Sequence, residues 1–165
     1  MASRIIRFPD PDYLYTKKSQ IKGAGLGLFT KKDIQRDEVI VRFHGELLTE
    51  RQVTIRLNKG EDSYFVETND DTIMDSRKVP GFAKYANDAV GLGPTGFKNN
   101  ALITFDDDDN VCLTALRKIK AGEEIFTAYG KEYWDNYKRK FKEAKAKRPK
   151  AAKKKTSKKK VAKKK

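Results

Sequence analysis

A glycine-rich segment, "KGAGLGLF" at residues 22–29, is the first place in the sequence where residue types and spacing could do chemistry. Glycines at this density let the backbone approach a ligand closely, and such loops often hold phosphates. The known phosphate patterns do not fit, because a dinucleotide-binding loop needs glycine where Leu28 stands and a P-loop ends in Gly-Lys-Ser/Thr. From these residues alone, a tight hairpin turn is the better interpretation.

Three further features could indicate catalysis or metal binding, and each has a simpler explanation. Four aspartates at 106–109 are followed by no other ligand pattern, so we expect a solvated turn between two strands that could attract a basic partner. His44, the only histidine, ends a strand-like run and is interpreted as structural rather than as a base. Cys112 is expected to be a buried thiol, since a single cysteine excludes a disulfide framework and a multi-cysteine zinc site. We therefore expect no metal and a reducing compartment.

Positive charge is concentrated at the end of the 165-residue chain, whose formal net charge is +14. Residues 138–165 hold 17 of the 37 Lys and Arg residues and one Glu, so they carry +16 and residues 1–137 carry the remaining −2. From Arg148 the composition is low-complexity Lys and Ala, which is typical of disorder and similar to the C-terminal tail of a linker histone.

A tail of this kind binds the phosphate backbone of nucleic acid by releasing counterions. A solubilising tail and a nuclear-targeting signal are the alternatives. The residues expected to bind nucleic acid are Lys153, Lys154, Lys155, Lys158, Lys159 and Lys160.

The body of the chain is long enough to bury a core, and its periodicity indicates mostly short strands. Strand-like runs are "EVIVRFHG", "SYFVET", "TIMDS", "ALITF", "NVCLTAL" and "EEIFTAYG". Residues 49–60 are a helix or a loop, one helical turn can follow Pro80, a short helix can follow Trp134, and residues 90–96 are interpreted as a flexible insertion. No apolar run has the length of a membrane span and the start lacks a secretory signal, so we expect an intracellular protein with no membrane partner.

Four motifs in sequence order resemble those of the SET-domain protein lysine methyltransferases. "GAGLGLF" (23–29) is similar to that family's Gly-x-Gly-Leu-Phe, and "FHG" (43–45) to its Tyr-x-Gly. "GFAKYAND" (81–88) is similar to Arg-Phe-x-Asn-His-Ser, and "GEEIFTAYGKEYW" (122–134) to Glu-Leu/Ile followed by Tyr-Gly. The resemblance covers roughly residues 13–136.

This resemblance implies a mostly β fold, the SET-type β-clip, with several small sheets and few short helices. It also implies a C-terminal pseudoknot in which the segment bearing Asn87 meets the one bearing Tyr129. We accordingly expect a SET-type catalytic domain at 1–137 and a Lys-rich tail at 138–165 that is disordered beyond about residue 147.

The resemblance further implies S-adenosyl-L-methionine as the cofactor, so the glycine loop would hold a sulfonium compound rather than a phosphate. Asn87 matches the family's cofactor-binding asparagine, and Asp88 stands where the family usually has histidine. Tyr64 and Trp134 resemble aromatic residues that wall the cofactor and the lysine channel. The implied cofactor-binding set is Ala24, Gly25, Leu26, Gly27, Tyr64, Asn87, Asp88 and Trp134.

Tyr129 matches the tyrosine at the base of the family's lysine channel and is the predicted catalytic residue. Methyl transfer from a sulfonium to an amine is an in-line displacement, which requires alignment and a neutral lysine. Deprotonating a free lysine at neutral pH costs about 5 kcal/mol, and an aromatic channel lowers that cost by desolvating the ammonium. A buried structural tyrosine is the alternative role for Tyr129. The other predicted channel residues are Phe43, Ile103, Thr127 and Tyr133.

This sequence departs from the family pattern at several positions. Phe43 replaces the tyrosine of Tyr-x-Gly, and Thr127 stands where a Phe or Tyr often controls the product, so the number of methyl groups is not predicted. The cysteine-rich zinc segment that follows the domain in many relatives is missing, and residues 131–137 are expected to close the channel instead. The insertion at 89–99 is expected to shape substrate choice.

The expected function is lysine methylation of histones or other basic proteins, since a slightly acidic body suits a cationic peptide. The Lys-rich tail would tether the protein to nucleic acid or be a substrate itself. The alternatives are a chromatin-architectural DNA-binding protein whose SET-like body no longer catalyses, and a nucleotide-phosphate binder. We expect a nuclear or chromatin-associated protein, or a nucleoid or virus-associated one if the source is not a eukaryote; the oligomeric state is not predicted.

Overall fold

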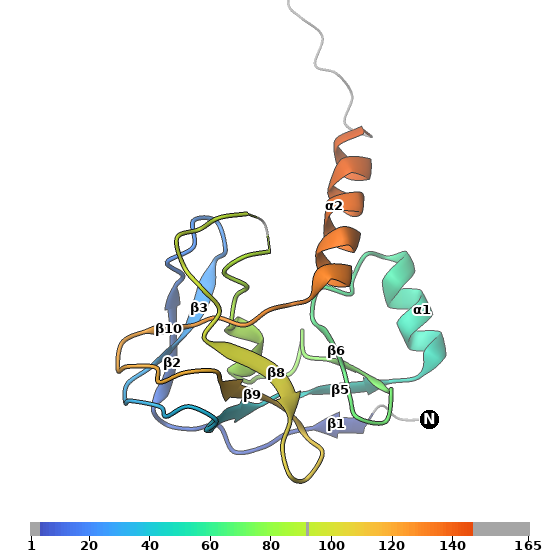
Figure 1. Cartoon of the computed structure of the whole chain (residues 1–165). Coiled ribbons are helices and arrows are strands. Elements are labelled where there is room, and N and C mark those ends of the chain that lie inside the picture. Colours follow the sequence, from blue (N-terminus) through green and yellow to red (C-terminus); the bar gives the residue numbers. More distant parts are fainter. Residues whose placement is uncertain (1–3, 92, 147–165) are drawn as a thin grey trace, which may run out of the picture.

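The computed structural model describes residues 4–91 and 93–146, which form mostly short strands with two helices and one 3₁₀ turn (Figure 1). In chain order the elements are β1 (Arg4–Ile6), β2 (Leu14–Lys18), β3 (Leu26–Thr30), β4 (Val39–Arg42), β5 (Gly45–Leu48), α1 (Glu50–Asn58), β6 (Phe65–Glu67), β7 (Ile73–Asp75), η1 (Ala83–Tyr85), β8 (Ala101–Phe105), β9 (Val111–Ala115), β10 (Glu124–Ile125) and α2 (Lys131–Ala146). Every strand-like run expected from the sequence contains one of these strands.

The strands form three small antiparallel sheets with the orders β1-β5-β7-β6, β10-β3-β2 and β4-β9-β8. The glycine segment joins β2 to β3 as a hairpin, in which Lys18 pairs with Leu26. Residues 106–109 form the turn of the β8–β9 hairpin, as expected for the four aspartates. The predicted mostly β fold with several small sheets is therefore confirmed.

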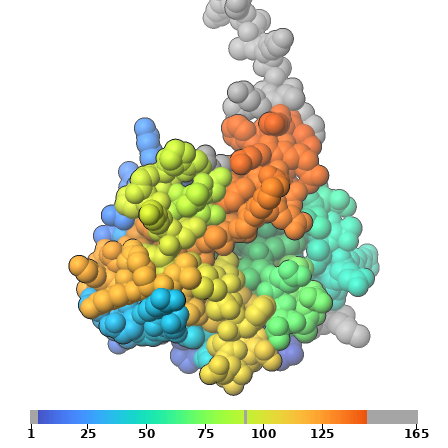
Figure 2. Space-filling view, in the orientation of Figure 1, coloured from blue at the N-terminus to red at the C-terminus, as the bar shows by residue number. Residues whose placement is uncertain are grey.

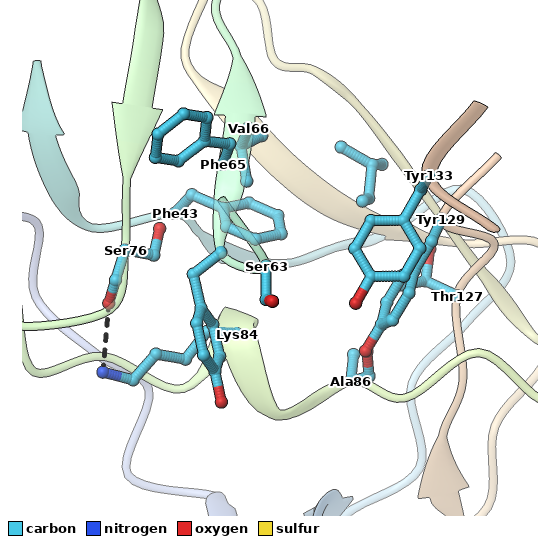
Figure 3. A pocket seen from close by; sticks show the side chains of 12 residues that line it. Phe43, Ser63, Phe65, Val66, Ser76, Lys84, Ala86, Thr127, Tyr129 and Tyr133 are labelled. Atoms are coloured by element: carbon cyan, nitrogen blue, oxygen red, sulfur yellow. Dashed lines mark hydrogen bonds between the residues drawn. The ribbon is translucent and has the colours of Figure 1, made fainter. Parts of the chain in front are cut away.

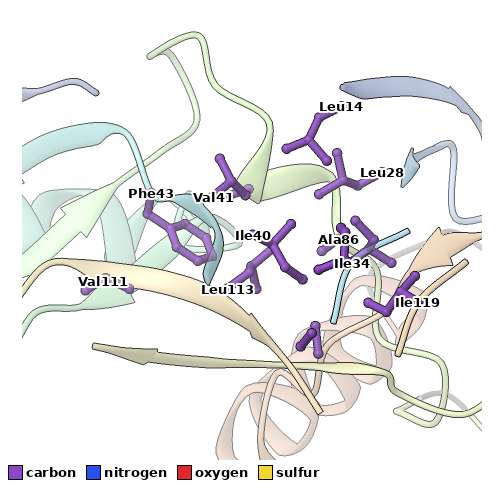
Figure 4. Close-up of a cluster of buried hydrophobic side chains, with 14 of the residues drawn as sticks. Leu14, Leu28, Ile34, Ile40, Val41, Phe43, Ala86, Val111, Leu113 and Ile119 are labelled. Atoms are coloured by element: carbon purple, nitrogen blue, oxygen red, sulfur yellow. The ribbon is translucent and has the colours of Figure 1, made fainter. Parts of the chain in front are cut away.

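One hydrophobic core serves all three sheets, because each contributes side chains to it (Figure 4). Leu28 of β3, Ile40 of β4 and Leu113 of β9 are almost completely buried. Burying one such side chain contributes about 1.5–3 kcal/mol. Cys112 is also fully buried, as the sequence predicts.

The segment from β10 to Tyr129 passes beside two others and pairs with both. Isolated parallel bridges join Asn87 to Phe126 and Ala101 to Thr127. The Thr127 N–H donates to the Asn87 carbonyl at 2.9 Å, and the Phe126 carbonyl accepts the Ala101 N–H at 2.9 Å. The segments bearing Asn87 and Tyr129 thus meet as the pseudoknot expectation requires.

The helix α1 lies on the surface and buries no side chain. Its first turn is closed by a capping box between Thr49 and Gln52, which satisfies two backbone N–H groups. The Arg56 guanidinium ties the helix to the sheet through ion pairs with Glu46 of β5 and Asp75 of β7. The segment 49–60, for which the sequence allows a helix or a loop, therefore contains a helix that is stabilised by its capping box and by ion pairs.

The helix α2 begins at Lys131 and stands away from the sheets (Figure 1). It runs through residue 137, where the sequence analysis placed the end of the catalytic domain. No helix within 4–91 and 93–146 is long and apolar enough to cross a membrane. Most of the Lys-rich tail, including the six lysines expected to bind nucleic acid, lies outside the described residues.

Candidate active site

A narrow pocket of about 90 Å³, here called the channel, lies between β6, η1 and the segment bearing Tyr129 (Figure 3). Tyr129 and Tyr133 stand side by side on one wall, with Phe43 and Phe65 across from them. All of the channel residues predicted from the sequence line it. The complete lining is Phe43, Ser63, Tyr64, Phe65, Val66, Ser76, Lys84, Ala86, Ile103, Thr127, Tyr129 and Tyr133.

Tyr129 is fixed at both its backbone and its hydroxyl. Its O–H donates to the Ala86 carbonyl at 3.0 Å, and its N–H donates to Asp88 Oδ2 at 3.0 Å. Burial raises the pKa of Tyr129 far above its ordinary value of 10.0, and the nearby acidic groups Tyr133, Asp88 and Tyr64 raise it further. The hydroxyl therefore stays protonated at neutral pH, so it can form hydrogen bonds but cannot accept a proton as a phenolate would.

An aromatic cluster continues from Tyr129 into α2. The Tyr129 and Trp134 rings stack with centroids 5.8 Å apart, and Tyr133 meets Tyr129 edge-on at 4.8 Å. Aromatic faces attract cations, and they exclude water from whatever lies between them. The channel is therefore suited to taking an ammonium group and lowering its pKa by desolvation.

Two buried hydroxyls of the channel have no hydrogen-bond partner among the described residues. They are Oγ of Ser76, which is 2% exposed, and Oγ1 of Thr127, which is 1% exposed. A buried hydroxyl without a partner costs about 1–3 kcal/mol. Both residues line the channel, so both hydroxyls are available to a group that enters it.

Lys84 also lines the channel, but its amino group is already occupied. Its Nζ donates to the backbone carbonyls of Ser76 at 3.1 Å, Arg77 at 3.2 Å and Val79 at 2.8 Å. Burial lowers the pKa of Lys84, which Asp75 opposes. Because three carbonyls hold its ammonium, Lys84 is a structural cation that joins η1 to the 76–79 segment.

A groove of about 670 Å³, here called the glycine groove, opens on one side of the channel and contains the predicted cofactor loop. Gly23 and Gly25 have positive φ angles of 87° and 78°, and a Cβ on either would meet nothing within 4 Å. The Asn87 amide donates to the Leu26 carbonyl at 2.9 Å, which fixes the edge of the loop. The predicted residues that line this groove are Ala24, Gly25, Leu26, Tyr64, Asn87, Asp88, Trp134, Tyr129 and Tyr133.

Gly27 does not line the glycine groove, and its role is packing. A Cβ there would lie 2.0 Å from Oε1 of Glu124, which is 1% exposed. Glu124 accepts hydrogen bonds from the Ser19 hydroxyl at 2.6 Å and the Gln20 N–H at 2.7 Å. These bonds fix the residues that follow β2, where the glycine loop begins. Sequence reasoning missed Glu124, although its place in "GEEI" two residues before Phe126 belongs to a quoted motif.

Asp88 lines the glycine groove, but its carboxylate bonds to the protein. Oδ1 accepts N–H groups of Val90 at 2.9 Å and Gly91 at 3.2 Å, and Oδ2 accepts the Trp134 indole N–H at 2.8 Å as well as the Tyr129 N–H. Burial favours a higher pKa for Asp88, but these hydrogen bonds outweigh it and lower the pKa below 3.8. The carboxylate therefore stays ionised at neutral pH.

The insertion after Asp88 packs on the first turns of α2, and Figure 2 shows the two segments in contact. A Cβ on Gly91 would lie 1.7 Å from Cε2 of Trp134, so only glycine fits beneath the indole. Thr95 of the same insertion lines the glycine groove. The insertion, interpreted as flexible from its composition, is thus anchored to the site.

A second groove of about 670 Å³, here called the helix groove, opens between β6 and α2. It shares Tyr129 and Tyr133 with both the channel and the glycine groove, so both grooves adjoin the channel. Its rim includes the carboxylates of Glu67 on β6 and Glu132 on α2. Two separate molecules can therefore approach one channel from different sides.

His44 lies outside this arrangement. Its Nε2 accepts the Phe8 N–H at 3.3 Å and its Nδ1 lies 2.7 Å from the Pro80 carbonyl, so the ring bridges two backbone segments. It lines none of the three cavities just described. The structural interpretation of His44 thus fits its contacts.

Residues 25–130 match the SET domain, and the chain therefore belongs to the SET-domain family. It is 24% identical over 127 residues to "Histone-lysine N-methyltransferase 2D" of Homo sapiens, covering 74% of this chain and 2% of that protein. It is 27% identical over 120 residues to "Histone-lysine N-methyltransferase trr" of Drosophila melanogaster, covering 70% of this chain and 5% of that protein.

A crystal structure of an active polycomb repressive complex 2 in the basal state is also similar. The TM-score is 0.59 at 26% identity, over 72% of this chain and 15% of that chain. The SET-like fold implied by the motifs is thus confirmed. The chain spans only a small part of each of these relatives.

Proposed function

We propose that the protein is an S-adenosyl-L-methionine-dependent protein-lysine N-methyltransferase that acts on histones or other basic chromatin proteins. The observation that carries this proposal is the aromatic channel with Tyr129 on its wall, open to one groove that contains the glycine loop and to another between β6 and α2. Membership of the SET-domain family supports it.

The glycine groove fits the proposed cofactor. Its open loop at Gly23 and Gly25 leaves backbone groups accessible, since no other atom lies where a side chain would begin. Asn87 would hold the loop edge, while Tyr64 and Trp134 would face the cationic part of the ligand. When bound there, S-adenosyl-L-methionine would supply an electrophilic methyl group on sulfur.

The residues of this chain would orient and deprotonate the lysine. Tyr129, Tyr133 and Phe43 exclude water from the channel, which favours the neutral amine that the reaction needs. The Tyr129 hydroxyl is held at the Ala86 carbonyl, and these two oxygens can accept polarised C–H or N–H groups. Alignment by a fixed wall would contribute to the rate of such a displacement.

The acidic residues of the helix groove support a basic substrate, and the similarity to histone-lysine methyltransferases supports a chromatin setting. Glu67 and Glu132 at the helix groove would attract a cationic peptide. The relatives named above are histone-lysine methyltransferases, so we propose a chromatin-associated protein, nuclear where the source has a nucleus. We also propose that the lysines at 153–155 and 158–160 bind nucleic acid by counterion release, which predicts affinity that falls steeply with salt.

Transfer of a labelled methyl group from S-adenosyl-L-methionine to mixed histones, followed by mass spectrometry, tests the function. We expect methyl-lysine with the wild-type chain and a loss of at least a hundredfold with Tyr129→Phe. Tyr15→Phe removes a phenol that forms no hydrogen bond with the described residues, so it is the matched control. Cofactor binding without transfer to any protein would instead support the non-catalytic architectural alternative.

A further inference from the structure

The helix groove has an acidic rim whose charges are not neutralised by its own surroundings. Glu67 and Glu132 are exposed, and neither forms an ion pair with any side chain described in 4–91 or 93–143. A third carboxylate, Asp62, is already paired with Lys140 of α2. The groove therefore presents two free carboxylates on opposite walls beside the channel, which suits a peptide with basic residues on both sides of the entering lysine.

The geometry of α2 determines where the next part of the chain starts. Glu132 and Tyr133 in its first turn line the helix groove, and the described part of the helix extends to Ala146. At 1.5 Å per residue, Ala146 lies about 20 Å along the helix from Tyr133. Figure 1 shows that this helix stands away from the sheets, so Ala146, the last described residue, lies about 20 Å from the channel wall at Tyr133.

The lysines after Ala146 divide into two sets, according to whether the chain that connects them to Ala146 is long enough to reach the channel. A chain spans at most about 3.6 Å per residue, so roughly six residues are needed to return 20 Å. Lys147 and Lys150 are too close to Ala146 to place their Cα beside Tyr133 at the channel, whereas Lys153 and every later lysine can do so. A covalent connection of this length gives an effective concentration in the millimolar range.

We propose that the helix groove binds the Lys-rich segment of this same chain, and that lysines within 153–165 enter the channel in cis and are methylated. This proposal rests on the proposed function. The lone pair of a neutral lysine Nζ forms the new N–C bond while the C–S bond of the sulfonium donor breaks. The sulfur keeps the electron pair as a neutral thioether, and the methylated ammonium releases one proton to water.

The runs "KKKTSKKK" and "KKKVAKKK" match the groove in charge, because every lysine in them has another lysine directly beside it. Charge complementarity and chain length therefore point to the same occupant. A histone tail or a second copy of the chain is a competitor for the same groove, and the experiments separate these occupants.

Incubation of the full-length chain with labelled S-adenosyl-L-methionine, with and without histones, is the first test. We expect methyl groups on lysines at 153–165 and none on Lys147 or Lys150, with a fraction modified per minute that does not change over a hundredfold range of enzyme concentration. A rate proportional to enzyme concentration, or methylation of Lys147 and Lys150, would overturn the cis proposal. Methylated histones beside an unmodified tail would also overturn the cis proposal but would support the proposed methyltransferase function. Absence of transfer to both histones and the tail would contradict the cis proposal and the proposed function together.

The second test needs no methyl donor. A fluorescent peptide with the sequence of residues 150–163 is titrated against the full-length chain and against a full-length variant in which the nine lysines of 153–165 are glutamine. If the tail occupies the groove, the glutamine variant binds the peptide several-fold more tightly. Equal affinities would contradict occupancy of the groove by the tail.

Charge variants of the groove provide the matched control for that titration. Glu67→Gln with Glu132→Gln should weaken peptide binding to the glutamine-tail variant about two- to tenfold, as expected for exposed ion pairs. Asp107→Asn removes one exposed carboxylate on the β8–β9 turn, away from α2, and should leave the affinity unchanged. An equal effect of the Asp107 change would show that net charge alone, rather than the groove, attracts the peptide.

Discussion

Asp88 Oδ2 accepts two hydrogen bonds, one from the Tyr129 backbone N–H at 3.0 Å and one from the Trp134 indole N–H at 2.8 Å. Its other oxygen accepts N–H groups at the start of the insertion. One carboxylate therefore joins the segment with the proposed catalytic tyrosine, the insertion and α2. The SET-domain motif usually has histidine at this position, whereas this chain makes the connection with an acceptor-only group.

Replacing Asp88 by asparagine should disrupt this connection. The amide has one oxygen, so its NH₂ group would face donor groups on one side whichever way it turns. We expect a loss of about 1–3 kcal/mol in the free energy of unfolding, together with slower methyl transfer. Thermal unfolding and transfer assays measure both, and Asp107→Asn again serves as the control on an exposed turn.

The loss of unfolding free energy caused by Asp88→Asn should be larger at neutral pH than at acidic pH. Because hydrogen bonds lower the folded-state pKa of Asp88, its contribution is fully present above the unfolded value near 4 and is lost as pH falls through the folded value. The difference between wild type and Asp88→Asn should therefore be large at pH 7 and shrink below about pH 4. A difference that stays constant from pH 7 to pH 3 would contradict the assigned role of the carboxylate.

Gly91→Ala should displace Trp134, because the new Cβ would lie 1.7 Å from the indole. The only tryptophan of the chain reports this directly, so its fluorescence emission should shift toward that of an exposed indole. We also expect weaker binding of S-adenosyl-L-methionine, since Trp134 lines the glycine groove. Val90→Ala changes an exposed neighbouring side chain and should leave the emission unchanged.

Gly27→Ala should perturb the cofactor loop through Glu124 rather than by blocking the groove. The added Cβ would overlap Oε1 of Glu124 and push that carboxylate away from Ser19 and Gln20. Overpacking of this kind costs about 1–3 kcal/mol. Calorimetry should show weaker cofactor binding, and shortening the neighbour by Glu124→Asp in the same chain should restore part of it. No restoration would mean that Gly27 acts in another way.

The sequence predicts most of the strands and most of the residues that line the channel and the glycine groove, because both depend on local sequence patterns. Short apolar runs bounded by turn residues mark β8 and β9, and two of the four motifs contain Phe43, Thr127, Tyr129 and Tyr133, which line one channel. The helix α1 could not be recognised from periodicity, because it buries no side chain and so has no apolar face. The Thr49 capping box was the available signal.

Contacts between distant segments explain the rest of what sequence reasoning missed. Gly27 looks like a ligand-binding glycine until Glu124, nearly a hundred residues later, is found beneath it. The connections made by Asp88 also join residues 41 and 46 positions apart. Such roles depend on tertiary packing, which a local pattern does not contain. The extent of α2 was missed because its charged second half has few apolar residues beyond Tyr137 and Phe141.

Thr127→Val tests whether the unpartnered channel hydroxyls serve the reaction. Valine has the same shape without the buried oxygen, so the variant should be more stable by about 1 kcal/mol, or about 2–4 °C in Tm. Methyl transfer should fall, or the number of methyl groups added should change, because the hydroxyl can no longer bond to the amine. A variant with lower Tm and unchanged products would show that Thr127 already has a partner in solution.

The pH dependence of methyl transfer should follow the substrate lysine and not Tyr129. Burial keeps the pKa of Tyr129 well above the assay range, so its hydroxyl stays protonated from pH 7 to pH 10. While the lysine is mostly protonated and chemistry limits the rate, the rate should rise about tenfold per pH unit. Tyr129→Phe should lower the rate by the same factor at every pH, because it removes a positioning group and leaves the titrating group in place. A rising limb that disappears in the Phe variant would instead mean that the phenol itself titrates and acts as the base.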